Sequence, residues 1–159
     1  MEDWFSSNFS VLAVVSPGAY RKFVFWGVLS VGYFYVLLTR LALRVPCPWV
    51  RRSVFALALT ACVSLGYAML IPYLPDQIPD WAKLHVLLAA GSCVVLLAAL
   101  LILLVYWRNG RLLKLWLALN LCYGILFLLG GMVTSTLEVF FTLSAALLTR
   151  SLWVSIHDL

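Results

Sequence analysis

Five long apolar segments, separated by short polar breaks, make up most of the chain. They run over residues 23–43, 53–73, 81–107, 113–133 and 135–156. Each is at least as long as the roughly 20 residues that a helix rising about 1.5 Å per residue needs to cross the hydrocarbon core. Because lipid cannot satisfy exposed backbone groups, such segments cross as helices. The pattern predicts one all-α domain over residues 1–159, an integral membrane bundle of five transmembrane helices.

The residues before the first segment follow a different pattern. Residues 9–15 are apolar but too short to span a bilayer, and Ser16-Pro17-Gly18 interrupts them. Trp4 and Phe5 add aromatic side chains suited to a membrane–water interface. We therefore expect residues 1–20 to form an interfacial or re-entrant segment.

Composition supports a lipid environment. The chain is 65% hydrophobic, whereas soluble domains contain roughly 45–50% apolar residues. The net charge of +5 does not indicate nucleic acid as a partner, because membrane topology accounts for basic loops. We expect membrane lipids as partners.

The basic residues are unevenly distributed between the two predicted sides of the membrane. Of the 11 Lys and Arg residues, eight fall on one side: Arg40, Arg44, Arg51, Arg52, Arg108, Arg111, Lys114 and Arg150. The other side has Arg21, Lys22 and Lys83, together with Glu2, Asp3, Asp76 and Asp80. Because cytoplasmic loops are enriched in Lys and Arg, this predicts the N-terminus outside and the C-terminus inside.

Small residues predict where the helices pack. Ala58, Cys62 and Gly66 recur every four residues in the second segment, and Gly124 lies in the fourth. Small side chains at this spacing allow helix backbones to approach closely. We expect a tight bundle at these positions, the alternative being a cleft for a lipid chain.

Two ionisable residues lie inside apolar segments near the predicted outer face. His85 is five residues, or roughly 7 Å of helix, past Asp80. Glu138 is three residues past Ser135, at a similar depth. A hydrogen bond between His85 and Glu138 would lower the cost of burying each, so we predict an outward polar site. The candidate residues are His85, Glu138, Asp76 and Asp80. The alternative is that each meets water at the interface.

The sequence indicates no catalytic, metal or cofactor site. A catalytic zinc needs three protein ligands, and the only histidines, His85 and His157, are expected on opposite sides. Ser10 or Ser64 together with His85 and Glu138 would make a Ser–His–acid set, but serines are too common for this to carry weight. We therefore assign no catalytic residue, no metal and no cofactor, and the sequence favours a protein that is not an enzyme.

Several short stretches carry a family resemblance. They are residues 3–10, Pro17, residues 25–32, the prolines 72, 75 and 79 before residues 84–89, and Glu138. Over nearly its whole length the chain resembles the small bacterial multi-pass membrane proteins of unknown function related to the Frag/DRAM group. That group includes eukaryotic proteins associated with lipid remodelling of GPI anchors and with lysosomal membranes.

The resemblance implies a compact helical bundle with an outward polar site at His85 and Glu138, and no established reaction. Members of the family usually have six helices, and we expect this chain to lack the first.

Two functions are compatible with these features. The first is a small membrane protein acting through contacts, as an accessory subunit of a membrane complex or a lipid-binding module. Its partners would be lipids and other membrane subunits or further copies of the chain. The alternative is a membrane-embedded lipid-modifying or lipid-handling protein that uses His85 and Glu138.

Overall fold

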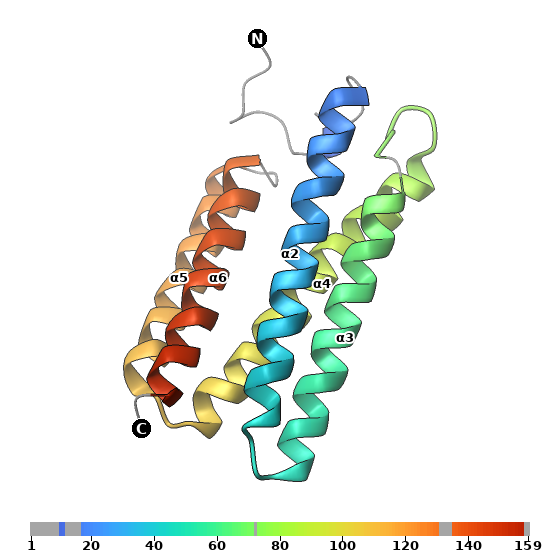
Figure 1. Ribbon diagram of the computed structural model, residues 1–159. Helices are drawn as coiled ribbons and strands as arrows, with labels where there is room; N and C mark the ends of the chain where they lie inside the picture. The colour runs from blue at the N-terminus through green and yellow to red at the C-terminus, as the bar shows by residue number, and fades with distance from the viewer. Residues whose placement is uncertain (1–9, 12–16, 72, 131–134, 158–159) are drawn as a thin grey trace.

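The structure, a computed structural model, describes residues 10–11, 17–71, 73–130 and 135–157 (Figure 1). Its five long helices are α2 (Pro17–Leu43), α3 (Pro48–Leu70), α4 (Pro79–Tyr106), α5 (Gly110–Gly130) and α6 (Ser135–His157). All five are long and apolar enough to cross a membrane, and the described residues contain no strand. The predicted all-α fold of five transmembrane helices is confirmed, and the chain is an integral membrane protein.

Proline sets the start of three helices. Pro17, Pro48 and Pro79 are the first residues of α2, α3 and α4. This position suits proline because the first backbone N–H of a helix has no intrahelical partner. Residues 17–20, expected in the interfacial segment, therefore form the first turn of α2. The rest of that segment, apart from Ser10 and Val11 with helical backbone, lies outside the described residues.

The helices form two groups (Figure 1). Helix α3 makes the most extensive contacts in the bundle, first with α4 and then with α2. Helices α5 and α6 contact each other and join the rest mainly through α4 and α2. The molecule is thus a three-helix unit with a helical hairpin packed against it.

The tightest packing is at one end of the bundle. Leu38 and Leu41 of α2, Leu100 and Leu103 of α4 and Leu152 of α6 are fully buried there. These residues come from the last turns of α2, α4 and α6, beside the start of α3. The core therefore lies at the end that carries the basic loops.

A three-residue turn joins α4 to α5 at this same end. Arg108 has a positive φ of 52°, and the Asn109 N–H donates to the Leu104 carbonyl at 3.2 Å. This arrangement closes a helix C-terminus by satisfying carbonyls that lack intrahelical partners. The Asn109 side-chain oxygen then accepts from the Leu112 N–H at 3.1 Å, which caps the N-terminus of α5. The turn therefore keeps both helix ends satisfied beside the membrane.

A few polar contacts attach α6 to the other helices. The Tyr33 hydroxyl donates to the Ala146 carbonyl at 3.0 Å, and the Asn109 amide donates to Ser155 Oγ at 3.2 Å. The Arg44 guanidinium lies 5.9 Å from the centroid of the Trp153 ring. Because lipid is as apolar as the helices, packing and hydrogen bonds of this kind drive helix association in membranes.

The small residues expected at close helix contacts differ in whether atoms of another helix lie beside them. Ala58 is fully buried, and the Cys62 thiol donates to the Val31 carbonyl at 3.7 Å. A Cβ added at Gly66 or Gly124, however, has nothing within 4 Å. The expectation of close approach is therefore not met at these two glycines, because the surface beside each is open.

The tight glycine is Gly27 of α2, which is buried. A Cβ added there would overlap Sδ of Met69 on α3. The absence of a side chain at Gly27 thus lets the Met69 thioether lie between the two helices.

Replacing Gly27 by alanine is expected to lower the melting temperature in detergent, because the new methyl group displaces Met69. Because the displaced atoms belong to a flexible side chain that lines a groove, we expect a cost near the low end of overpacking, about 1 kcal/mol. Gly32→Ala is the matched control, since it lies on the same helix with open space around its Cβ. Adding Met69→Ala should remove most of the difference between the two variants. Equal melting temperatures for Gly27→Ala and Gly32→Ala would contradict the predicted contact.

The orientation of the bundle stays a prediction, and cysteine labelling tests it. In a chain without its native cysteines, an impermeant maleimide added outside should label Gln77→Cys and leave Gly110→Cys unlabelled. Gln77 is exposed in the α3–α4 loop, and a side chain at Gly110 meets open space. The cysteine is placed at Gly110 and not at the neighbouring Asn109, because the Asn109 side chain caps α5. Labelling of Gly110→Cys alone would reverse the orientation.

Candidate functional site

His85 is a buried polar residue near the start of α4. It lies six residues after Pro79 and is 5% exposed. Ala82, one turn earlier on the same face, is buried as well. Burying an imidazole without partners is costly, so its hydrogen bonds decide whether this position is stable.

Both ring nitrogens of His85 have partners. Nδ1 lies 2.9 Å from the Ile71 carbonyl oxygen, and Nε2 lies 2.7 Å from Ser10 Oγ. A carbonyl can only accept, so Nδ1 carries the hydrogen. In the neutral ring Nε2 is then the acceptor, and the Ser10 hydroxyl donates to it. The backbone thus selects one tautomer of His85 and points its basic nitrogen at a serine.

Three parts of the chain converge here. Ser10 precedes α2, Ile71 ends α3 and His85 belongs to α4. Tyr73 contributes a ring whose centroid is 5.6 Å from that of His85, at an interplanar angle of 50°. Ser10 is one of the two serines that the sequence offered. The Ile71 carbonyl was missed, since no residue type identifies a backbone acceptor.

Two of the acidic residues expected at the polar site, Asp76 and Asp80, are exposed to solvent. Asp76 is exposed in the loop. The Asp80 side chain is 93% exposed and lies 3.5 Å from the Lys83 ammonium, a surface pair of small energetic value. Asp80 therefore belongs to the solvated start of α4.

Glu138 is half-buried in the first turn of α6. Its carboxylate interacts electrostatically with Cys93 of α4. Cys93 is eight residues past His85, which is about 12 Å further along the helix. Ile71 and Ser10 are the partners of the two ring nitrogens of His85. The pairing of Glu138 with His85 stays a prediction from the sequence.

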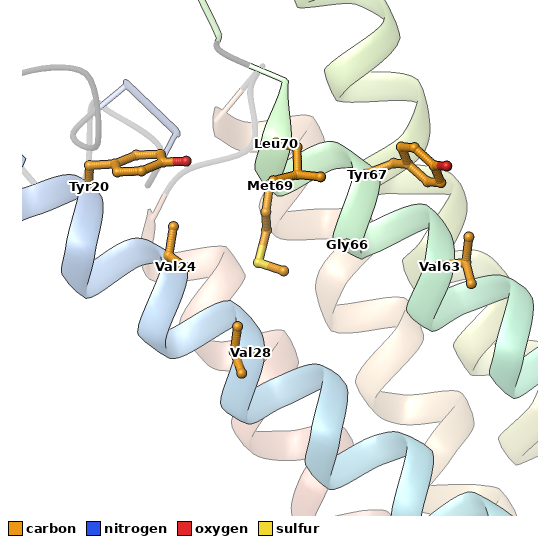
Figure 2. Close-up of a pocket in the computed structure, with 8 residues that line it drawn as sticks. All are labelled: Tyr20, Val24, Val28, Val63, Gly66, Tyr67, Met69 and Leu70. Carbon is orange, nitrogen blue, oxygen red and sulfur yellow. The ribbon is translucent and has the colours of Figure 1, made fainter.

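An apolar groove opens at the same end of the bundle. Its volume is about 380 Å³, and Figure 2 shows it between α2 and α3, with Met69 extending from α3 toward α2. It is lined by Tyr20, Val24, Val28, Val63, Gly66, Tyr67, Met69 and Leu70. Leu70 directly precedes Ile71, whose carbonyl holds His85. The groove and the histidine cluster therefore share the end of α3, although none of the lining residues belongs to the cluster.

Within the described ranges, no three His, Cys, Asp or Glu side chains are grouped so as to hold a metal ion. The four cysteines are free thiols.

No family model, no curated protein and no solved structure matches this chain. The resemblance to the Frag/DRAM-related proteins stays a prediction.

Ser10→Ala is expected to destabilise the protein, because it leaves the buried Nε2 of His85 without a donor. Such a loss costs about 1–3 kcal/mol. His85→Ala should also destabilise, and the double variant should cost less than the sum by about 0.5–3 kcal/mol. Thermal unfolding of the purified protein in one detergent measures all three.

The same cycle with Glu138→Ala tests the pair expected from the sequence. A coupling between Glu138 and His85 would support it, and additive effects would make Glu138 an independent residue. Additive effects of Ser10→Ala and His85→Ala would contradict the hydrogen bond.

Proposed function

We propose that this protein is a lipid-binding module of the membrane whose α2–α3 groove holds an acyl chain. The groove is the observation that carries the proposal. Its volume of about 380 Å³ lies within the range of about 300–1,000 Å³ typical of ligand pockets. Its lining is aliphatic apart from the two tyrosines, Met69 and Gly66.

The arrangement of the lining residues supports a lipid in one orientation. Tyr20 is in the first turn of α2 and Tyr67 in the last turn of α3, so both lie near the end of the bundle. Tyrosine hydroxyls favour the level of lipid headgroups. Val24, Val28 and Val63 lie deeper in the spans. An acyl chain would contact the valines, while the polar end of the lipid would lie near the tyrosines.

The surroundings of the groove support a lipid as the occupant. Its walls belong to two membrane-spanning helices, so hydrocarbon is the solvent that reaches it. We place this end of the bundle on the outer side of a bacterial inner membrane, because the basic loops are at the other end.

An accessory subunit is the second candidate, and helix α5 favours it. None of residues 110–129 is buried, and the exposed side chains include Leu121, Leu128 and Leu129. A second membrane subunit or another copy of the chain would cover this helix. Purification in mild detergent distinguishes the two, because an accessory subunit would come with a stoichiometric protein partner.

Gly66→Leu is expected to reduce lipid binding without unfolding the protein, because the leucine enters the groove. We expect at least about a tenfold loss, which corresponds to about 1.4 kcal/mol. Cross-linking of a phospholipid with a diazirine in its acyl chain, followed by peptide mapping of α2 and α3, measures the effect.

Gly124→Leu on α5 is the matched control, since its Cβ also meets open space but lies outside the groove. Undiminished cross-linking to α2 and α3 in Gly66→Leu would show that the groove does not hold the chain. A melting temperature lowered only in Gly66→Leu would restore the close-packing interpretation of that glycine.

A further inference from the structure

We propose that Ser10 and His85 form a nucleophile–base pair that hydrolyses a carboxylic ester of a membrane lipid. The nature of the substrate rests on the proposed function, because the acyl chain of that ester would lie in the α2–α3 groove. The geometry of the two side chains supports the pair itself.

The distance and direction of the hydrogen bond suit proton transfer. Ser10 Oγ is 2.7 Å from His85 Nε2, within the roughly 2.6–3.2 Å expected of a nucleophile and its base. Because Nδ1 carries the hydrogen, the free electron pair of Nε2 points at the Ser10 hydroxyl. The neutral ring of His85 therefore has the tautomer that a general base requires.

The Ile71 carbonyl performs the orienting role that a carboxylate has in a Ser–His–Asp triad. It accepts from Nδ1 at 2.9 Å and so holds the ring and its tautomer. A neutral carbonyl orients the ring without adding a buried carboxylate. This suits a site where His85 is 5% exposed and Ser10 is 7% exposed. The pair is a dyad with a backbone orienter.

Other hydroxyl groups in the chain show that Ser10 is unusual. Ser30 donates to the Trp26 carbonyl, Ser92 to the Ala89 carbonyl and Thr149 to the Ala145 carbonyl, each within its own helix. Such local bonds are the common way to satisfy a serine or threonine in a membrane helix. Ser10 instead donates across 75 residues to a basic nitrogen, so its hydroxyl has the partner that increases nucleophilicity.

Ile71, which orients His85, is next to the groove along the chain. Leu70 lines the groove, and Ile71, the following residue, orients His85. Consecutive Cα atoms are about 3.8 Å apart. A lipid with its chain between α2 and α3 would present its ester region near the end of α3, the helix end whose Ile71 carbonyl holds His85.

The reaction balances with water as the second substrate. Ser10 Oγ attacks the ester carbonyl carbon while its proton moves to Nε2 of His85. The bond from that carbon to the alcohol oxygen breaks, and Nε2 returns the proton to the departing alkoxide. Water then attacks the acyl-Ser10 ester and gives a proton to Nε2. The fatty acid leaves as the Ser10 oxygen regains that proton.

Alkyl fluorophosphonates test the proposal, because an activated serine displaces fluoride and keeps the phosphonyl group. The full chain in lipid nanodiscs is treated with a long-chain and a short-chain reagent, and peptide mass spectrometry locates the adduct. We expect modification of Ser10 by both reagents. His85→Asn should slow it by at least about a hundredfold, since general base catalysis is worth about 10²–10⁴.

The variants separate loss of reactivity from loss of structure. The asparagine amide can still donate to the Ile71 carbonyl but puts nothing in place of Nε2. Ser10→Ala removes the site of modification. Ser92→Ala, another buried serine that bonds only within its helix, should change nothing. No adduct on Ser10, or an equal rate in His85→Asn, would overturn the nucleophile–base pair.

The long-chain reagent also separates this inference from the proposed function. Gly66→Leu should slow the long-chain reagent and leave the short-chain reagent unchanged. Modification of Ser10 with no effect of Gly66→Leu on either reagent would support the pair and overturn the groove as the acyl site. Lipid cross-linking to the groove without any adduct on Ser10 would leave the lipid-binding function and overturn the esterase.

Discussion

A backbone N–H or C=O group without a partner costs several kcal/mol in hydrocarbon, and this constraint governs the whole structure. It makes each apolar segment a helix. It also explains the turn at Arg108 and Asn109, where backbone and side-chain hydrogen bonds close α4 and cap α5 within three residues. The same constraint applies to side chains, so a buried imidazole persists at His85 because both of its nitrogens are bonded.

The helices pack differently at the two ends of the bundle. At the end with the basic loops, leucines from α2, α4 and α6 are fully buried against one another. At the other end, α2 and α3 meet through Gly27 and Met69 and leave a groove. Helix association in lipid depends on close packing and on a few hydrogen bonds. One well-packed end is therefore sufficient to hold the helices while the other end remains open to a ligand.

The open end combines features that a lipid-processing site requires. It has an apolar groove, two tyrosines among the residues that line it, and a buried serine that donates to a histidine whose tautomer the backbone selects. The resting arrangement has no buried charge, because the Ser10 hydroxyl, the neutral imidazole and the Ile71 carbonyl satisfy one another. A neutral dyad is compatible with a site inside the membrane boundary, where a buried carboxylate is costly.

The sequence by itself determined the class of fold, because an apolar run of about 20 residues in lipid has one stable solution. It also singled out His85 as an ionisable residue in an unusual place. Only the tertiary structure decided that Gly27, and not Gly66 or Gly124, is the tight glycine. It alone decided that Ser10 and the Ile71 carbonyl are the partners of His85. The sequence does not fix how each helix is rotated about its axis, because a uniformly apolar helix has no face that must point inward. Contacts between distant residues, such as the one across 75 residues between Ser10 and His85, depend on that rotation.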